Sequence, residues 1–398
     1  MITVAEAEEI IFSHLQDPGD EFVSFNNSLH RILAEDIYSD RDQPPFDRAT
    51  MDGIAISYKN FEEGTKRFSI TGLQAAGSQP LTITGMNDCI EIMTGAALTA
   101  TADTIIPYEQ IEIEGKFANI ISNEIRHGQN IHRQGSDMLK GEIIIRSARK
   151  ISPQILSILA SVGKVSVKVK KNPRIAIIST GDELVPMAEQ PAPYQIRTSN
   201  SSLIKGCLLS LKIDTDIYHY NDDKETLLSG LSANIETNDI LIITGGISMG
   251  KLDLIPDVLQ ELGMKMQFSK VSQKPGKPFL FGTIGEKKTV FAFPGNPVSA
   301  CLCFYRYFIP WFQKSNGLVV SEQFATLNST ITFKANLTFF ALVKLFTDQK
   351  SLVIAEPIPG NGSGDFTTLA TADAFMELPR ERNTFEKGEA FKIWPLIK

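Results

Sequence analysis

A repeating alternation of buried-strand and helix patterns between Pro173 and Phe312 constrains this chain more than any other feature. The stretch 174–179 is a continuous apolar run, as expected of a parallel strand buried on both faces of its sheet. Helical segments then alternate with further short apolar runs, which predicts a doubly wound α/β domain over residues 171–317. The expected strands are 174–179, 213–219, 239–244, 279–283 and 289–293, and the expected helices are 199–211, 222–235, 252–262 and 297–312.

The flanking segments differ in pattern, and 398 residues exceed what one hydrophobic core usually organises. Short strands and glycine-rich turns predict an inserted, mostly β domain over 44–141. Residues 1–43 and 142–170 are then expected to form a linking domain that begins with an amphipathic helix. Residues 318–398 return to strands and turns, which predicts a small C-terminal domain resembling a β-barrel. The fold class is therefore multidomain, part α/β and part β.

Composition excludes several kinds of protein. The chain carries 39 basic and 46 acidic residues, so it lacks the cationic surface of a general nucleic-acid binder. No apolar stretch approaches membrane-spanning length, and the first fifteen residues lack the basic start and apolar run of a signal peptide. The four cysteines match no zinc or disulfide spacing. We expect a cytoplasmic protein with neither a nucleic-acid nor a membrane partner.

Four unusual loops are expected at the edge of the predicted sheet where ligands bind in open α/β folds. Each loop by itself is better explained as a tight turn, but four at one edge indicate a ligand site. Glycine-rich backbone lets N–H groups approach an anion closely. The first loop is 180–183, and the other three supply the candidate binding residues Gly245, Gly246, Ser248, Gly250, Lys274, Gly276, Lys277, Pro278, Pro294, Gly295, Asn296 and Pro297.

Two of these loops carry more specific expectations. Asn296 can cap a helix that starts at Pro297, which would leave that helix N-terminus free to face a phosphate or oxyanion. Lys274 and Lys277 lie in a stretch stiffened by prolines and can supply fixed positive charge, although a solvated lysine pair is the alternative. Gly245 to Lys251 also fits the start of a P-loop, but Leu252 stands where a P-loop needs Ser or Thr. We therefore exclude an ordinary P-loop NTPase.

Acidic residues accompany the same loops. Carboxylates beside a bound phosphate usually hold Mg²⁺, which offsets charge and polarises the scissile anhydride. Asp222 opens the run Asp222-Asp223-Lys224-Glu225, so a helix cap is an equal alternative for it. The acidic candidates in the α/β domain are Asp182, Glu183, Asp222 and Asp253, and those in the β domain are Asp52 and Asp137.

Motifs in one order along nearly the whole chain resemble the MoeA family and its eukaryotic relatives, the gephyrin E domain among them. Any one motif is moderately specific, whereas the set in this order is very specific. Thr50 and Ile54 are mild variants within the first motif. The matching stretches are Gln43 to Ala55, Met93-Thr94-Gly95-Ala96, Arg133 to Asp137, Thr180 to Leu184, Gly245 to Asp253, Lys274 to Pro278 and Pro294 to Ser299.

The resemblance implies an Mg²⁺-assisted transferase of molybdenum cofactor biosynthesis. Its substrates would be molybdate and adenylylated molybdopterin, whose phosphoanhydride is cleaved with release of AMP. It also implies a homodimer whose cleft is shared between subunits, with the linking domain used in dimerisation, and a molybdopterin adenylyltransferase as pathway partner. Carried over by motif, the catalytic or metal-site group would be Asp52, Thr94, Asp137, Glu183, Asp222 and Asp253, with Glu183, Asp222 and Asp253 on the metal; Lys274, Lys277, Pro294, Pro297 and Ser299 would line the pterin and molybdate end.

One segment departs from the family. Many members carry an arginine-containing stretch in the C-terminal domain that is implicated in holding molybdate, and residues 336–342 lack those arginines. Lys277, Ser299 and Ser363 are then left to hold the oxyanion. Two alternatives stay open: the adenylyltransferase of the preceding step, which normally lacks the flanking domains, and a scaffold or carrier that binds molybdopterin without turnover.

Overall fold

The computed structural model describes residues 1–247, 253–360 and 362–397. The chain divides into two compact units, of which the first comprises residues 1–34, 148–152 and 166–398, and the second comprises residues 35–147 and 153–165. Within the described ranges, no helix is both long enough and apolar enough to cross a membrane.

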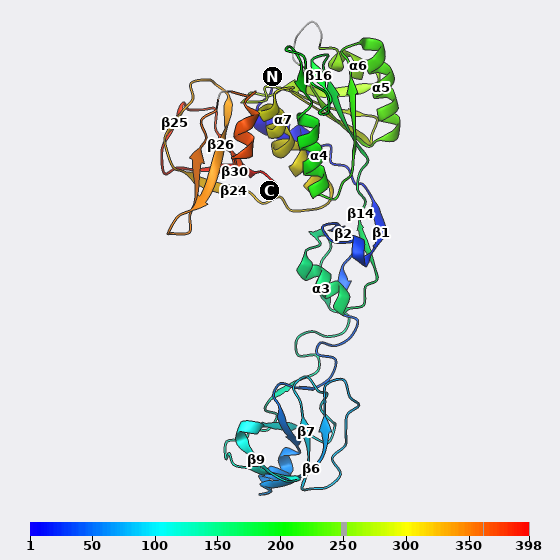
Figure 1. The fold of residues 1–398 in the computed structure, drawn as a ribbon, viewed down its shortest axis with the longest axis vertical. Coiled ribbons are helices and arrows are strands. Elements are labelled where there is room, and N and C mark those ends of the chain that lie inside the picture. Colours follow the sequence, from blue (N-terminus) through cyan, green and yellow to red (C-terminus); the bar gives the residue numbers. More distant parts are fainter. Residues whose placement is uncertain (248–252, 361, 398) are drawn as a thin grey trace. The chain divides into compact units, whose positions relative to one another are not determined.

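A six-stranded sheet forms the centre of the first unit (Figure 1). Four neighbouring strands are parallel, as predicted, whereas the last two are antiparallel to their neighbours. An antiparallel edge is common on such sheets. In spatial order the strands are β18 (Asp216–Tyr220), β15 (Ile175–Thr180), β19 (Ile240–Thr244), β23 (Lys288–Phe293), β22 (Pro278–Ile284) and β20 (Met264–Lys270).

Strand β20 was missed by the sequence prediction. Its alternation of Met264, Met266 and Phe268 with polar residues is the period-two signal that could have revealed it. Helix α6 begins at Ile255, three residues later than expected, and ends at Glu261, directly before this strand.

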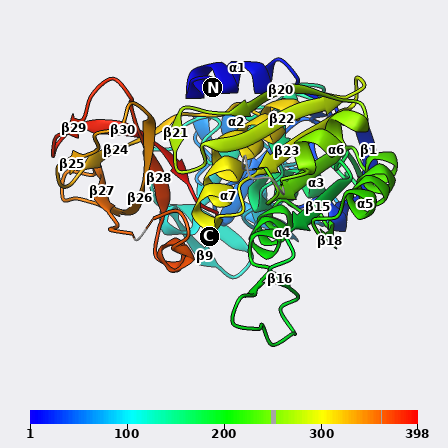
Figure 2. The same cartoon turned by 90° about the horizontal axis from the view of Figure 1, so that it is seen from above.

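Helices cover both faces of the sheet, so that apolar side chains are buried on each side (Figure 2). One face packs on α5 and α6, and the other packs on α1, α4, α7 and α8. A π-helical turn separates α7 from α8 within the predicted long helix. The helices are α1 (Val4–Phe12), α4 (Asn200–Ser210), α5 (Lys224–Thr237), α6 (Ile255–Glu261), α7 (Pro297–Cys303), η3 (Phe304–Phe308) and α8 (Ile309–Ser315).

The C-terminal part of the first unit is a small closed β-barrel. Its strands pair in the ring β26, β27, β24, β30, β28 and back to β26, around buried residues such as Val343 and Met376. Two-residue strand β21 (Gln273–Lys274) adds to β26 in parallel. The barrel strands are β24 (Gln323–Leu327), β26 (Thr338–Thr347), β27 (Val353–Pro357), β28 (Ala374–Leu378) and β30 (Ala390–Pro395). The short strands β25 (Ile331–Thr332) and β29 (Thr384–Phe385) form a separate antiparallel pair.

The first unit also contains a small four-stranded sheet. Asp20 to Ser24 pair antiparallel with Ser166 to Lys170, so segments far apart in sequence complete one element. The strands are β1 (Asp20–Ser24), β14 (Ser166–Lys170), β2 (Ile32–Leu33) and β13 (Arg149–Lys150), and β16 (Leu184–Val185) with β17 (Ile196–Arg197) form a separate pair.

The second unit is mostly β, as predicted for residues 44–141. Its six-stranded sheet buries Ile54, Phe68 and Ile106 in one cluster and Ala55 and Ile105 in another. The sheet runs β8 (Thr104–Pro107), β5 (Gly53–Ile56), β7 (Asp88–Ile92), β6 (Arg67–Gln74), β10 (Phe117–Ile120) and β9 (Ile111–Glu114); the short pairs are β4 (Arg48–Ala49) with β11 (Ile131–His132) and β3 (Ile37–Tyr38) with β12 (Ile143–Ile145), and the helices are α2 (Tyr58–Glu62) and α3 (Pro153–Ser161).

Candidate active site

The predicted ligand loops of the first unit lie at one edge of the central sheet. Register pairs Thr180 with Tyr220, and Thr244 with both Ser179 and Phe293, so the carboxyl ends of four parallel strands are level. The loops that follow them therefore emerge side by side. Strand β22 runs antiparallel to β23, which brings the loop before β22, residues 274–277, to the same edge. The loop at residues 274–277 precedes its strand, and it therefore lies at the same edge as the loops that follow the parallel strands.

Glycines let the backbones of these loops touch. The N–H of Gly245 donates to the carbonyl of Phe293 at 3.1 Å. A Cβ on Gly245 would lie 2.5 Å from the carbonyl oxygen of Thr180, and one on Gly246 would lie 2.7 Å from the Thr180 hydroxyl. Both glycines also have positive φ, so a side chain would be strained as well as crowded. The candidate residues Ser248 and Gly250 lie outside the described residues.

The acidic residues of the first unit are close enough to perturb one another. Burial, and then the negative charges of Asp182, Glu183 and Asp253, raise the pKa of Asp222, and His219 partly offsets this. The N–H of Asp222 donates to Asp182 Oδ1 at 3.1 Å. The Oδ1 of Asp222 is buried, and no donor among the described residues forms a hydrogen bond with it. A buried carboxylate oxygen without a partner among like charges is an environment that a cation would relieve.

The alternative that Asp222 is only a helix cap is wrong, because its neighbour Asp223 caps the helix. Asp223 is the N-cap of α5, and its side chain accepts the N–H of Thr226 at 2.9 Å. Asp222 is thereby left facing the carboxylates of the adjoining loops.

These carboxylates do not form a complete metal-binding set by themselves. Among the described residues, no three or more His, Cys, Asp or Glu side chains are gathered as a metal site. Mg²⁺ characteristically uses one or two protein carboxylates and completes its shell with water and substrate phosphate oxygens. The acidic group therefore fits a cation that arrives with a phosphorylated substrate.

The lysine loop is exposed at its two charged positions and buried between them. Lys274 and Lys277 are exposed, whereas Gly276 is buried with a φ of 80°. The ammonium of Lys274 lies 5.5 Å from the centre of the Phe333 ring, so the side chain of Lys274 is close to the barrel domain. Pro278 begins strand β22.

The N-terminus of α7 differs from the expectation. Helix α7 does start at Pro297, but Asn296 makes no capping hydrogen bond with its side chain. Instead, Asn296 Nδ2 donates to the hydroxyl of Ser363 at 2.9 Å, and the N–H of Val298 donates to the Ser363 carbonyl at 3.1 Å. The expectation of a free helix N-terminus is therefore wrong, because Ser363 covers it.

Two further residues, Ser299 and Asn200, belong to the surroundings of the loop that precedes α7. Ser299 is buried within α7. Asn200, which the sequence analysis missed, donates its side-chain amide to the carbonyl of Gly295 at 2.7 Å and so fixes the loop between Pro294 and Asn296. Asn200 is the first residue of α4, and no motif marked it.

The remaining predicted residues form two hydrogen-bonded groups in the second unit. Asp52 Oδ1 accepts the backbone N–H of Thr94 at 2.6 Å and its hydroxyl at 2.7 Å. These bonds, the backbone one first, lower the pKa of Asp52. Asp52 is exposed, so a stable carboxylate is presented to solvent. Gly53 must follow it, since a Cβ there would lie 2.0 Å from the carbonyl oxygen of Ile106.

Asp137 belongs to a second group that the sequence analysis found only in part. His132 Nε2 lies 2.7 Å from Asp137 Oδ1, and Arg48 Nη2 lies 3.1 Å from His132 Nδ1. An arginine can only donate, so Nδ1 accepts and the Nε2–H donates to Asp137. His132 and Arg48 are paired through strands β11 and β4, a contact that sequence spacing does not reveal.

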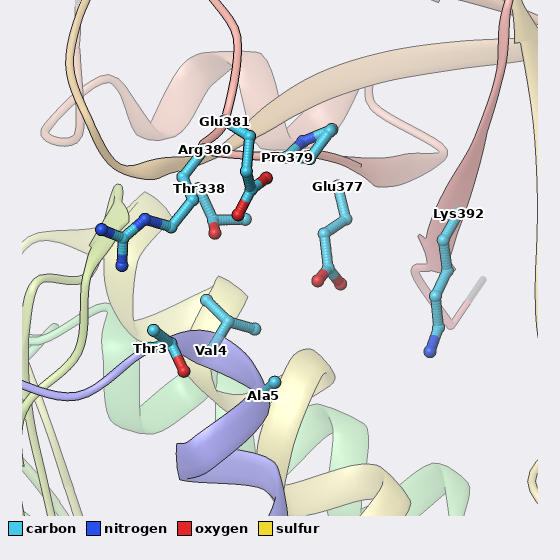
Figure 3. Close-up of a pocket in the computed structure, with 9 residues that line it drawn as sticks. All are labelled: Thr3, Val4, Ala5, Thr338, Glu377, Pro379, Arg380, Glu381 and Lys392. Atoms are coloured by element: carbon cyan, nitrogen blue, oxygen red, sulfur yellow. The ribbon is translucent and has the colours of Figure 1, made fainter.

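An arginine lies beside residues 336–342, the segment in which the resemblance led us to expect arginines. Arg380 Nε donates to Asn336 Oδ1 at 3.2 Å. Arg380 also lines a cavity of about 330 Å³ between the start of α1 and the barrel (Figure 3). None of the predicted site residues that the structure describes lines it. Figure 3 shows Glu377 and Lys392 at the same cavity.

Comparisons with known proteins cover almost the entire chain. A model of the MoeA N-terminal region (domain I and II) matches residues 2–163, a probable molybdopterin binding domain matches 176–314, and the MoeA C-terminal region (domain IV) matches 325–396. The chain belongs to the MoeA family. The resemblance drawn from the motifs is therefore confirmed.

Individual MoeA relatives agree in length as well as in sequence. A molybdopterin molybdenumtransferase from Synechocystis is 38% identical, covering 99% of this chain and 100% of that protein. One from Bacillus subtilis is 29% identical, covering 96% and 91%. A crystal structure of the molybdopterin biosynthesis MoeA protein from Pyrococcus horikoshii aligns with a TM-score of 0.85 at 30% identity, covering 99% of each chain. The predicted multidomain fold class is thus confirmed, whereas the four domain boundaries and the individual site residues stay predictions.

Proposed function

We propose that this chain is a molybdopterin molybdenumtransferase, which inserts molybdenum into molybdopterin in molybdenum cofactor biosynthesis. Full-length relatives carry that name, one of them at 38% identity. The observation that carries the proposal is the edge of the central sheet at which the parallel strands end. The glycine-rich loops and the lysine loop lie at this edge, and so does Asp222, whose pKa is raised. Such an edge combines anion-binding backbone with a cation site.

The finer proposal concerns the substrates. The molybdopterin would arrive as its AMP ester, which a molybdopterin adenylyltransferase of the same pathway supplies. Glycine backbone and the exposed Lys274 and Lys277 would bind the phosphates. Water would cleave the phosphoanhydride, which releases AMP and leaves the other phosphate on molybdopterin. The two dithiolene thiols would bind molybdate in place of one oxygen, which leaves as water.

Glu183, Asp222 and Asp253 would hold Mg²⁺ together with substrate oxygens, and the ion would neutralise charge and polarise the anhydride. The unpartnered Oδ1 of Asp222 supports this assignment.

Molybdate is a tetrahedral anion, for which bidentate arginine would be the strongest ligand. In this chain Lys277, Ser299 and Ser363 would have to hold it. The contact of the Ser363 hydroxyl with Asn296 supports a place for Ser363 in this site. The buried position of Ser299 supports a role in shaping the site more than in direct contact. We propose weaker molybdate binding than in arginine-bearing relatives.

The cleft would be completed in a homodimer. Asp52, Thr94 and Asp137 are exposed on the second unit, and their hydrogen bonds to one another and to His132 present organised carboxylates. We propose that these residues reach the sheet edge of the partner subunit.

The decisive experiment is an assay of AMP release from adenylylated molybdopterin by the purified protein, with and without molybdate. Molybdate-dependent release of AMP supports the proposal. Binding of molybdopterin without release would favour the scaffold or carrier, which the missing arginines of residues 336–342 keep in consideration. Formation of the AMP ester from ATP would favour the adenylyltransferase.

A further inference from the structure

A buried hydrogen-bond network lies beneath the lysine loop. Gln273, the residue before Lys274, is completely buried. Its Nε2 donates to the carbonyl of Gly276 at 3.0 Å, and its Oε1 accepts the hydroxyl of Tyr307. The backbone N–H of Val271 donates to the carbonyl of Lys277 at 3.0 Å. The loop is therefore closed by one backbone bond and held internally by the Gln273 amide.

Gly276 packs closely on this amide, with no room for a larger side chain at that position. A Cβ on Gly276 would lie 2.9 Å from Gln273 Nε2 and 3.0 Å from Cys303 Sγ. Gln273 Nε2 also lies 3.8 Å from that sulfur. The floor of the loop thus consists of Gln273 and the end of α7, in direct contact with Gly276.

Tyr307 reaches this floor from the π-helical turn η3. It is 1% exposed, and its ring centre lies 4.8 Å from that of Phe279 in β22. Burial raises the pKa of Tyr307 well above its ordinary value, so its hydroxyl remains a hydrogen-bond donor. Tyr307 therefore holds Gln273 in the rotamer that reaches Gly276.

We infer that Gln273 and Tyr307 are positioning residues that set the spacing of Lys274 and Lys277 for the substrate. This rests on the proposed function, in which the lysine loop binds molybdopterin. Charged side chains on a preorganised loop lose less conformational freedom when a ligand binds. A loop without the Gln273 anchor would have to be ordered by the ligand itself, at the expense of affinity.

The test compares two tyrosines of the same helical turn in the full-length protein. Tyr307→Phe removes the hydroxyl that holds Gln273. Tyr305→Phe is the matched control, because the Tyr305 hydroxyl is also buried and hydrogen-bonded, to Cys207 and to the N–H of Ile397, away from the loop. The dissociation constant of molybdopterin, thermal stability, and amide exchange in residues 272–277 are measured for both.

We expect molybdopterin to bind Tyr307→Phe about three- to ten-fold more weakly than the wild type, as for a lost hydrogen bond. Tyr305→Phe should lose similar stability with unchanged affinity. Equal dissociation constants in the two variants would overturn the inference. If the wild type does not bind molybdopterin, the proposed function fails instead. Amide exchange then decides: faster loop exchange in Tyr307→Phe alone supports positioning, and unchanged exchange overturns it.

Discussion

At the scale of single residues, the two candidate carboxylates with perturbed pKa values are shifted in opposite directions for opposite reasons. Burial and neighbouring acids raise the pKa of Asp222, whereas hydrogen bonds from Thr94 lower that of Asp52. The environment of Asp222 therefore disfavours its ionised form, whereas that of Asp52 favours the ionised form. Opposite shifts of this kind often mark groups with different chemical roles.

Asp222→Asn should stabilise the metal-free protein while reducing AMP release by at least about 100-fold, since a metal at developing charge contributes several kcal/mol. Because folding raises the pKa of Asp222, the ionised side chain costs stability above that pKa and costs nothing where it is protonated in both states. The gain in melting temperature should therefore be present at neutral pH and vanish as the pH falls to the ordinary aspartate range. Melting curves between pH 4 and 8 check this. A lower melting temperature at pH 7 would contradict the assigned repulsion.

Thr94→Val should move the acid limb of the pH–activity profile to higher pH. The variant loses the hydroxyl donor but keeps the larger backbone contribution, so only part of the lowering of the Asp52 pKa disappears. Thr84→Val is the control, because it removes an exposed hydroxyl that contacts a different aspartate, Asp88, in the same unit. A profile that shifts equally in both variants would speak against Asp52.

At the scale of elements, strand direction and close backbone contacts decide what the site contains. The antiparallel direction of β22 brings the lysine loop to the sheet edge. The short strand β21, at the start of this loop, pairs with β26 of the barrel. In the second unit, β5 places Asp52 at its start only because Gly53 lets β8 approach.

Gly53→Ala should destabilise the second unit by about 3 kcal/mol or more, because the new methyl group would overlap a backbone carbonyl that cannot move away. Gly115→Ala is a suitable comparison. The φ of Gly115 is positive, unlike that of Gly53, and a Cβ on Gly115 would meet no atom within 4 Å, so we expect about 1–2 kcal/mol from backbone strain alone. Amide exchange of β5 and β8 in the intact chain measures both effects. A free-energy cost for Gly53→Ala no larger than that for Gly115→Ala would contradict the assigned overlap with the Ile106 carbonyl.

At the scale of the molecule, a buried ion cluster joins the barrel to the α/β part of the first unit. The guanidinium of Arg306 in η3 is 4% exposed and contacts Glu8 of α1 and Glu377 of β28. It also lies 4.2 Å from the Trp394 ring. Removing one partner of such a cluster leaves an uncompensated buried charge, so these contacts hold β28 of the barrel against α1 and η3.

The proposed shared cleft makes a prediction about mixed dimers. Asp52→Asn and Lys277→Ala should each be inactive alone. A heterodimer of the two should recover about half of the wild-type activity, because one of its two symmetric clefts receives both native residues. AMP release by purified, differentially tagged heterodimers measures this. No recovery would contradict the shared cleft, because it would mean that Asp52 and Lys277 of the same chain act in one cleft.

The amino-acid sequence by itself determined the elements and the residue types at their ends. Apolar runs such as 174–179 are typical of strands buried on both faces of a sheet, and glycine-rich loops with carboxylates follow them in the sequence. The family motifs added the expected roles. Helix α7, the parallel strands and the β-rich flanks could be predicted because local periodicity records which side of an element is buried.

Only the tertiary structure decided which groups meet. It assigned the α5 cap to Asp223 and left Asp222 among acids. It covered the start of α7 with Ser363, joined His132 to Asp137 and placed Gln273 under the lysine loop. These contacts connect residues from different elements, often distant in sequence. Their geometry depends on strand order and direction, which local patterns do not encode because pairing energies arise only when the chain is folded.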